Sequence, residues 1–308
     1  MLIFSDNRNL TYKFLGNKVE LLSDNIPLPD EIKSLYDVSF SSRKVYKYEL
    51  RNEKYWNYLF LVKNANKSQF DLLVELNSHN QLPDRIVCVA EQGSGFHGFR
   101  NRTWDAQSGN LHLSLFFIPQ SGFKNIHAGL LIASAASIIE TIDSIPGLYG
   151  MAFAKWVNDI LINNSKVAGV ITQTSSIGNK ITGAMIGIGL NVVTNPVIEK
   201  DEFTPRASCL KNYTDSSQCN LEFVFNGLLP NLTKNIKMLS VEEYPNLLKT
   251  YCDRSAVIGK TVSVYSDPTD GNSEKIITGK VISINENLEL IFEDNTDQIR
   301  SGRLVLPE

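Results

Sequence analysis

The chain has 308 residues, of which 43% are hydrophobic and 20% are charged, and its formal net charge is −3. This length fits two domains, or one large domain with additions. The apolar content excludes a mainly disordered chain, because such chains are poorer in apolar residues and richer in charge. The charge balance disfavours a dedicated nucleic-acid-binding protein, since that class usually carries a basic excess.

The sequence carries no signal for a membrane or for an oxidising compartment. No stretch approaches the roughly 20 consecutive apolar residues that a membrane helix needs, and the first residues turn polar too early for a signal peptide. No two cysteines form a C-x-x-C pair, which favours reduced, partly buried thiols over disulfides or a zinc site. We therefore expect a cytoplasmic protein. The cysteines are Cys88, Cys209, Cys219 and Cys252.

The sequence pattern of residues 1–62 predicts a β-rich extension, and the sequence does not identify its role. Short β-rich segments are separated by polar turns, and one short helical pattern ends at Leu35. We find no pair of amphipathic helices joined by a tight turn, so we expect no DNA-binding domain. The predicted strands span residues 12–15, 19–22, 45–50 and 55–62.

Residues 63–253 show a mixture of strand and helix patterns. Helical spacing over 66–76 is followed by the apolar run 86–90, which is short enough for a buried strand. A polar, glycine-rich loop spans 91–108, and the long apolar segment 126–142 predicts a helix that packs closely on a sheet. Further strands are expected at residues 110–118, 150–156, 160–162, 167–174 and 181–193, and helices within 221–253.

The pattern changes again in the last part of the chain, residues 254–308. Several short strands with turns between them predict a small β-barrel of about 50 residues. These strands are expected at residues 261–265, 275–284, 288–292, 297–300 and 303–306.

The loop at residues 92–104 is the first candidate for chemistry. Its glycines let the backbone approach a ligand closely, and the planar guanidinium groups of Arg100 and Arg102 suit phosphate or carboxylate oxygens. The loop therefore fits an anion site between two buried strands. A flexible surface loop with solvated arginines accounts for the same residues equally well.

Two later motifs are the other candidates. Lys155 ends an apolar strand, where its ammonium could neutralise a carboxylate or phosphate as charge builds up in a transition state. A plain charge at a strand end is the alternative, and Asn158 and Asp159 after it are common turn residues. Two glycines interrupt the apolar segment 187–191, which marks a bulge, a close approach of a ligand or a tight strand crossing.

Taken in this order, the motifs resemble the catalytic domain of biotin protein ligases, the biotin–acetyl-CoA-carboxylase ligases. The likeness covers roughly residues 64–195, and the C-terminal β-module is similar to the small SH3-like domain of that family. Three motifs are fairly specific for this family when they occur in this order. They are the Lys155 motif, the Lys-x-Ala-Gly-Val strand and the Gly-x-Gly-x-Asn strand. The matching stretches are residues 90–104, 108–115, 155–160, 166–170 and 187–191.

The resemblance implies an α+β fold with a mixed central β-sheet and packed helices, as in biotin/lipoate ligases. The implied domains are the N-terminal extension (1–62), the catalytic domain (63–253) and an SH3-like domain (254–308). In the implied reaction the biotin carboxylate attacks the α-phosphate of ATP and gives biotinyl-5′-AMP. A lysine of a carboxylase carrier domain then takes the biotinyl group. Mg²⁺ would shield the phosphates without a protein metal ligand, and a homodimer is implied by analogy.

The resemblance also implies roles for individual residues. Lys155, Arg100 and Arg102 would be catalytic, with Lys155 holding the carboxylate and adenylate oxygens and the arginine loop folding over the adenylate. The substrate-binding residues would be Ser68, Gln92, His97, Gly98, Phe99, Trp104, Asn110, Asn158, Asp159, Gly169, Gly187, Gly189 and Asn191.

This chain departs from the family pattern in its loop. The usual loop reads Gly-Arg-Gly-Arg-x-Gly-Arg before x-Trp, whereas alignment on Trp104 puts Phe96 at a glycine and His97 and Phe99 at two arginines. Two alternatives to a biotin ligase therefore stay open. One is a ligase for lipoate or another acyl acid on the same fold, and the other is a non-catalytic relative that binds a small acid or a protein. Retention of Lys155 favours the two ligases, whereas loss of two loop arginines favours the non-catalytic relative.

Overall fold

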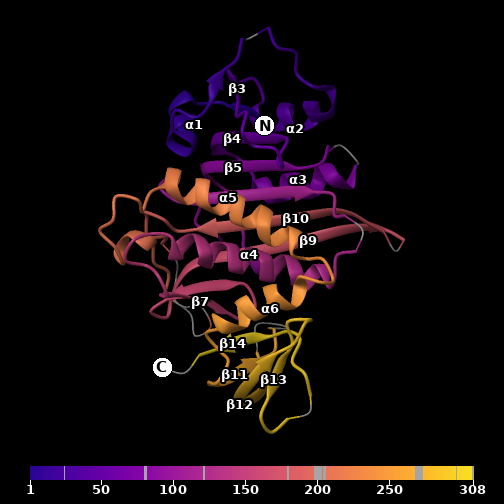
Figure 1. Cartoon of the computed structure of the whole chain (residues 1–308), viewed down its shortest axis with the longest axis vertical. Coiled ribbons are helices and arrows are strands. Elements are labelled where there is room, and N and C mark those ends of the chain that lie inside the picture. Colours follow the sequence, from indigo (N-terminus) through magenta and orange to yellow (C-terminus); the bar gives the residue numbers. More distant parts are fainter. Residues whose placement is uncertain are drawn as a thin grey trace.

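The computed structural model describes residues 1–23, 25–79, 82–120, 122–178, 180–197, 203, 206–267, 273–295 and 297–306. Within these residues the strands form one sheet of ten and one sheet of four. Figure 1 shows the large sheet running from the N-terminal strands to β7, with the small C-terminal sheet below it.

The strands of the large sheet are β1 (Leu2–Ser5), β2 (Glu20–Leu21), β3 (Tyr46–Glu49), β4 (Tyr58–Ala65), β5 (Ile86–Gly93), β6 (Leu111–Phe117), β7 (Ala152–Lys155), β8 (Asp159–Ile162), β9 (Ser165–Ile177) and β10 (Lys180–Leu190). Their order is β2-β3-β1-β4-β5-β6-β10-β9-β8-β7. The sheet is mixed, because β4 pairs in parallel with both β1 and β5 while the other pairs are antiparallel.

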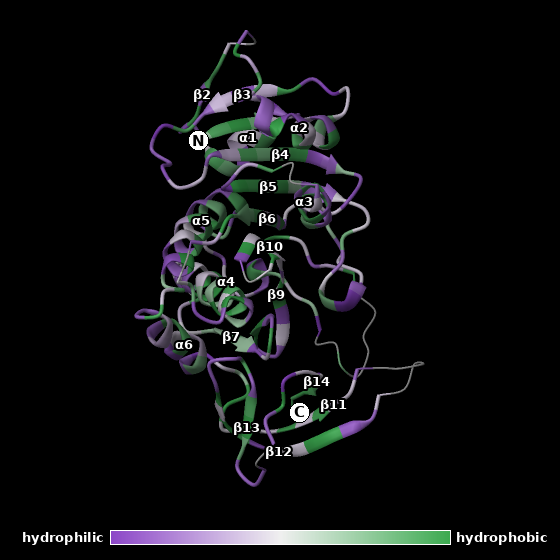
Figure 2. Ribbon diagram, turned by 90° about the vertical axis from the view of Figure 1, so that its right-hand side faces the viewer, coloured by the Kyte–Doolittle hydropathy of each residue, from purple (hydrophilic) through white to green (hydrophobic). Residues whose placement is uncertain are grey.

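Helices cover both faces of this sheet. They are α1 (Arg8–Leu15), α2 (Lys33–Phe40), α3 (Gln69–Ser78), α4 (Ile126–Asp143), α5 (Leu221–Lys237) and α6 (Tyr244–Asp253). Figure 2 shows α4, α5 and α6 on one side of the sheet and α3 on the other.

The two-residue period of the strands divides the core between these faces. In β4 and β5, Leu59 and Val87 pack in the cluster that contains α4 and α5, whereas Phe60 and Cys88 pack in the cluster that contains α2 and α3. Both faces of the central strands are therefore buried, which explains the continuous apolar run that predicted a buried strand over 86–90.

Helix α4 is the apolar core helix that the sequence predicts over 126–142. Among the described residues it is the one helix long and apolar enough to cross a membrane by length and composition, and 72% of it is buried inside the fold. Small residues let it lie close to its neighbours: a Cβ at Gly129 would stand 2.8 Å from Leu239.

The N-terminal part differs from the prediction in two ways. The strand expected at residues 12–15 is the second half of α1, because Leu10 and Phe14 are buried at helical spacing and the Asn7 side chain caps the helix by accepting from the Leu10 N–H. In addition, β1, β2 and β3 of the extension join the large sheet, and β4 runs across the boundary expected at residue 62, while the division into domains stays a prediction.

The C-terminal module is a four-stranded antiparallel sheet. Its strands are β11 (Thr261–Tyr265), β12 (Lys275–Ile284), β13 (Leu290–Phe292) and β14 (Arg303–Val305), in the order β13-β12-β11-β14. The strand expected at residues 297–300 is not formed there, and only an isolated bridge joins Ile299 to Leu290. The sheet is compatible with an SH3-like domain, whereas closure into a barrel stays a prediction.

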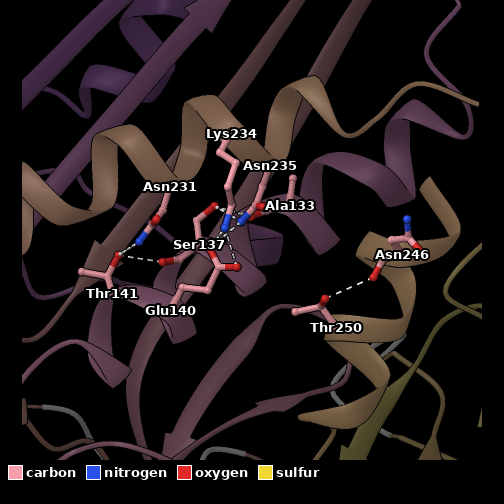
Figure 3. Close-up of polar contacts among 9 residues, drawn as sticks. All are labelled: Ala133, Ser137, Glu140, Thr141, Asn231, Lys234, Asn235, Asn246 and Thr250. Atoms are coloured by element: carbon pink, nitrogen blue, oxygen red, sulfur yellow. Dashed lines mark hydrogen bonds and ion pairs between the residues drawn. The ribbon is translucent and has the colours of Figure 1, made fainter. Parts of the chain in front are cut away.

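A polar network joins α4 to α5 within the core (Figure 3). Asn235 is buried, and its Nδ2 donates to Ser137 Oγ at 3.0 Å and to Glu140 Oε2 at 3.1 Å. The Lys234 ammonium donates to both oxygens of the same Glu140 carboxylate. The network therefore satisfies the buried amide and fixes how the two helices face each other.

We expect Asn235→Ala to lower the free energy of unfolding by about 1–3 kcal/mol, because it leaves buried polar partners on α4 without their donor. Asn246→Ala on the exposed side of α6 is the matched control, and we expect its effect to stay within about 0.5 kcal/mol. Urea unfolding of both variants measures the difference. Equal effects would show that the network does not contribute to stability.

Candidate functional site

A cavity of about 440 Å³ lies on the face of the large sheet that also carries α3. Its floor is made by alternate residues of three neighbouring strands, so that their side chains point to one face. Intervening residues of these strands, such as Ile186 and Ala168, pack in the core cluster that contains α4. The floor residues are His112 and Ser114 of β6, Gly169 and Ile171 of β9, and Gly187 and Gly189 of β10.

The glycines of the floor make room for the indole of Trp104. A Cβ at Gly189 would lie 2.2 Å from the Trp104 ring, and one at Gly169 would lie 3.4 Å from it. A Cβ at Gly187 would lie 2.8 Å from Ile171. The glycine strand that the sequence singles out is therefore a bare surface on which an indole of the same chain lies, and close approach of a ligand to it stays a prediction.

His112 holds the indole in place. Trp104 Nε1 donates to His112 Nδ1 at 3.3 Å, and the other ring nitrogen, Nε2, lies 3.0 Å from the Gln107 carbonyl oxygen. Because a carbonyl can only accept, Nε2 carries the proton and the ring is neutral. Burial lowers the pKa of His112 to about 4, against the opposing effect of Gln107 and Asp105, so the ring stays neutral at pH 7.

The loop at residues 96–104 forms a small hairpin over the cavity. The Gly98 N–H donates to the Arg102 carbonyl at 2.7 Å, and the Trp104 N–H donates to the Phe96 carbonyl at 3.0 Å. His97 and Thr103 form the bridge between the two arms. Each of these residues lines the cavity, as does Phe99. The glycine-rich loop of the sequence analysis is thus a folded wall.

The two arginines of the loop point to different places. Arg102 lines the cavity, and its Nε donates to the Phe99 carbonyl at 3.3 Å. Arg100 has a left-handed backbone conformation and pairs with Asp267 of the C-terminal module, outside the cavity wall. The geometry therefore places Arg102 in the cavity wall and gives Arg100 a link between the loop and the C-terminal module.

Lys155 ends β7, as predicted, and is buried with 6% of its surface exposed, but it is not among the residues that line the cavity. Its Nζ lies 3.5 Å from the Phe203 carbonyl. Burial lowers the pKa of Lys155, the Asp159 carboxylate opposes this shift, and the cations Lys166, Arg102 and Arg303 add to it. A lysine whose ammonium is disfavoured by burial and by three other cations gains most from an anion bound beside it.

Lys166 connects this cationic cluster to the cavity. Its Nζ lies 2.6 Å from Asp159 Oδ1 and 5.6 Å from the centre of the Trp104 ring, and the side chain lines the cavity. Asn158, also in the wall, donates to the Val170 carbonyl at 2.8 Å. Asn158, in the turn after Lys155, and Lys166, at the start of β9, therefore both line the cavity.

Other predicted binding residues lie elsewhere. Asn110 is buried outside the cavity, and its Oδ1 accepts from the backbone N–H groups of residues 192–194. Asn191 donates to the Ser208 carbonyl at 3.0 Å. Gln92 donates to Asn64 in a separate open recess. Asn110 and Asn191 therefore hold loops together, and neither they nor Gln92 reach the cavity of the described structure.

The structure brings most of the other predicted residues together. The predicted residues in the cavity wall are Ser68, His97, Gly98, Phe99, Arg102, Trp104, Asn158, Gly169, Gly187 and Gly189. The sequence interpretation missed Phe70, Ser114 and Lys166 as residues of the cavity wall. Phe70 and Ser114 lie in apolar segments, and nothing in those segments indicates a ligand-binding role. Lys166 is the first residue of the Lys-x-Ala-Gly-Val motif, so the motif could have identified it. Among the described residues no group of three or more His, Cys, Asp or Glu side chains could hold a metal ion.

We expect Gly189→Ala to displace the Trp104 indole and to lower the free energy of unfolding by about 1–3 kcal/mol, the usual range for overpacking. In the Gly189→Ala, Trp104→Phe double variant the smaller ring should recover at least half of that loss. Chemical unfolding of the two single variants and the double variant measures the coupling. Simple addition of the two single effects would contradict the contact.

We also expect Lys155→Met to raise the melting temperature of the ligand-free protein by about 2–6 °C, because it removes a buried charge from a cationic cluster. Lys249→Met removes an exposed charge on α6, where the lysine is paired only at the surface, and should shift it by less than about 1 °C. Differential scanning calorimetry distinguishes the two. A lower melting temperature for Lys155→Met would contradict the unfavourable burial.

Three comparisons relate the chain to known proteins. The sequence profile of the biotin/lipoate A/B protein ligase family matches residues 62–191. The chain is 30% identical over 134 residues to the bifunctional ligase/repressor BirA of Bacillus subtilis, which covers 43% of this chain and 40% of that protein. It is 24% identical over 220 residues to the biotin–[acetyl-CoA-carboxylase] ligase of Mycobacterium tuberculosis, covering 68% and 75%. The chain thus spans less than half the length of the Bacillus relative.

The fold is shared with a biotin protein ligase of Aquifex aeolicus. A mutant form of that ligase in complex with biotin matches with a TM-score of 0.61 at 22% identity, covering 81% of this chain and 97% of the other. Its complex with biotin and ATP matches with a TM-score of 0.59, also at 22% identity, covering 81% and 98%. The predicted α+β fold with a mixed central sheet is therefore confirmed. Over residues 62–191, the chain is similar to the biotin/lipoate A/B protein ligase family.

Proposed function

We propose that the protein is a biotin protein ligase, which activates biotin with ATP to biotinyl-5′-AMP and transfers the biotinyl group to a lysine of a carboxylase carrier domain. One observation carries the proposal: the cavity with the glycine floor is lined by Lys166 and Arg102, two of the cations that act on the buried Lys155. The relatives from Mycobacterium tuberculosis and Aquifex aeolicus, whose names include this activity or these ligands, support it.

The cavity suits a small acid with a polar head and an apolar body. Its volume falls in the range of small-molecule sites. Phe70, Phe96 and Trp104 supply apolar surface, and the buried hydroxyls of Ser68 and Ser114 lie in the wall. Ser68 makes no capping hydrogen bond with α3, so its hydroxyl can serve a ligand. The acid would lie against the Trp104 indole that covers the glycine floor, with its carboxylate toward the cations.

The cationic end fits the chemistry of adenylation. A carboxylate oxygen of the acid bonds to the α-phosphorus of ATP, and the bond from that phosphorus to the pyrophosphate oxygen breaks. Negative charge grows on the phosphoryl oxygens, and the cations of Lys155, Lys166 and Arg102 stand where they can neutralise it. Burial makes these interactions stronger than they would be in water.

The second step needs an amine from outside. The acceptor lysine of the carrier attacks the acyl carbon, an amide bond forms, and AMP leaves with the electrons of the acyl–oxygen bond. Mg²⁺ would enter with ATP as part of the substrate, since this ion is usually held by substrate phosphates and one or two carboxylates. The carrier domain, the homodimer and the absence of a DNA-binding domain stay predictions for this chain.

A second candidate, ligation of a different acyl acid, rests on the loop. His97 and Phe99 occupy places where the biotin ligase loop carries arginine, and both line the cavity. An altered wall can change which acid fits while Lys155 retains the adenylation chemistry. Lipoate and octanoate are therefore the acids to compare with biotin.

The experiment incubates the purified protein with ATP, Mg²⁺ and biotin, lipoate or octanoate and identifies the acyl-AMP by mass spectrometry. Biotinyl-AMP alone supports the proposal, and lipoyl- or octanoyl-AMP without biotinyl-AMP supports the second candidate. No acyl-AMP with any acid would contradict both and favour a non-catalytic binding protein.

In the same assay we expect Lys155→Met to lower the rate of acyl-AMP formation by roughly 10- to 150-fold, the worth of a charge-assisted hydrogen bond made in the transition state. The exposed Lys249→Met should keep the parent rate. Since Lys155→Met should melt at a higher temperature, unfolding cannot account for its loss. A Lys155→Met rate near that of the parent would remove the lysine from the mechanism.

A further inference from the structure

His97 makes contacts that demand a particular protonation state. Its Nε2 lies 2.8 Å from Asp71 Oδ1, and its Nδ1 lies 3.1 Å from the Gly98 carbonyl oxygen. A carbonyl oxygen and an ionised carboxylate only accept hydrogen bonds. Both contacts are hydrogen bonds only when both ring nitrogens carry a proton, that is, when the ring is an imidazolium.

The contact with Asp71 joins two walls of the cavity. His97 belongs to the hairpin at residues 96–104, whereas Asp71 lies in the first turn of α3, next to the wall residues Ser68 and Phe70. The two side chains are about a quarter exposed, at 26% and 29%. The ion pair therefore fastens the hairpin to the helix across the mouth of the cavity.

Asp71 is the charged group that acts on His97. Glu75, the other acid of α3, pairs with Lys67, which precedes the helix. The remaining charged residues of the cavity wall are Arg102, Asp105 and Lys166. Lys166 pairs with Asp159, and none of these three is among the causes of the shift in the pKa of His97.

We propose that His97 is a positioning residue whose doubly protonated ring locks the hairpin at residues 96–104 onto α3, and that loss of one proton loosens the closed cavity. Neither ring nitrogen is left to bind a substrate anion in this state. The role differs from that of an arginine at the same place, because an arginine stays charged throughout the physiological range. Only the identity of the ligand rests on the proposed function.

The direction of the pH effect follows from the contacts. Burial disfavours the imidazolium, but the Gly98 carbonyl and the Asp71 carboxylate together outweigh it and raise the pKa of His97 above its usual 6.5. The lock is therefore complete below about pH 6.5 and is lost as the pH rises through the raised pKa. A neutral ring carries one proton and keeps only one of the two hydrogen bonds.

The first test uses the full chain without any ligand. Hydrogen exchange of the Gly98 and Trp104 amides, which close the hairpin, is followed from pH 6 to pH 8.5 and corrected for the intrinsic exchange rate. We expect protection to fall about three- to tenfold over this range, the effect of a partly exposed charged contact. In Asp71→Asn these amides should have, at every pH, the low protection that the parent shows at pH 8.5. His97→Arg should show protection that does not change with pH.

Glu75→Gln is the matched control, because it removes another acid from the same helix that does not touch His97, and it should behave like the parent. Titration of the His97 ring by NMR gives the second readout. We expect its pKa to fall when Asp71 becomes Asn. A pKa of 6.5 or lower in the parent, or protection that does not change with pH, overturns the proposal.

The second test measures the rate of biotin dissociation by stopped-flow. Dissociation from the parent should become about three- to tenfold faster between pH 6 and pH 8.5, whereas dissociation from His97→Arg should not change. A lock seen in exchange without any biotin binding would refute the proposed ligand and leave the lock in place. Biotin binding with pH-independent exchange would refute the lock alone.

Discussion

The contact between the Trp104 indole and the bare strand at Gly189 shapes the rest of the site. Because a Cβ at this glycine would stand 2.2 Å from the ring, only a residue without a side chain lets the indole lie on the sheet. His112 then fixes the direction of the indole. The same alternation that clears this face sends Ile186 and Ile188 into the core against α4, so one strand provides both the support and the cavity floor.

The polar end of the cavity complements this apolar floor. Lys155 is buried among cations with Asp159 as its opposing charge, an arrangement that costs stability until an anion is bound. Proteins often keep such unfavourable charges where function requires them. The hairpin at residues 96–104 covers the same space and contacts both α3 and, through Arg100, the C-terminal module. The proposed binding of an acid, its activation and closure of the cavity would thus depend on one small set of contacts.

Elements with a strong local pattern could be predicted from the sequence. The buried strand at 86–90, the core helix over 126–142 and the glycine strand all have periodicities that the structure reproduces. Local pattern could not show that residues 1–62 add strands to the large sheet, because strand pairing depends on distant partners. It also could not separate Asn110 and Asn191, which hold loops, from Asn158 in the cavity wall. An amide has the same chemistry in either place, and only the fold decides its partner.

The most direct measurement is a crystal structure of the protein with a non-hydrolysable analogue of biotinyl-5′-AMP. The account predicts that a phosphate oxygen, or its replacement in the analogue, lies within about 3.2 Å of Lys155 Nζ. It also predicts that the biotin rings lie over the glycine floor beside Trp104. A phosphate bound elsewhere, with the Lys155 ammonium still directed at the Phe203 carbonyl, would contradict the account.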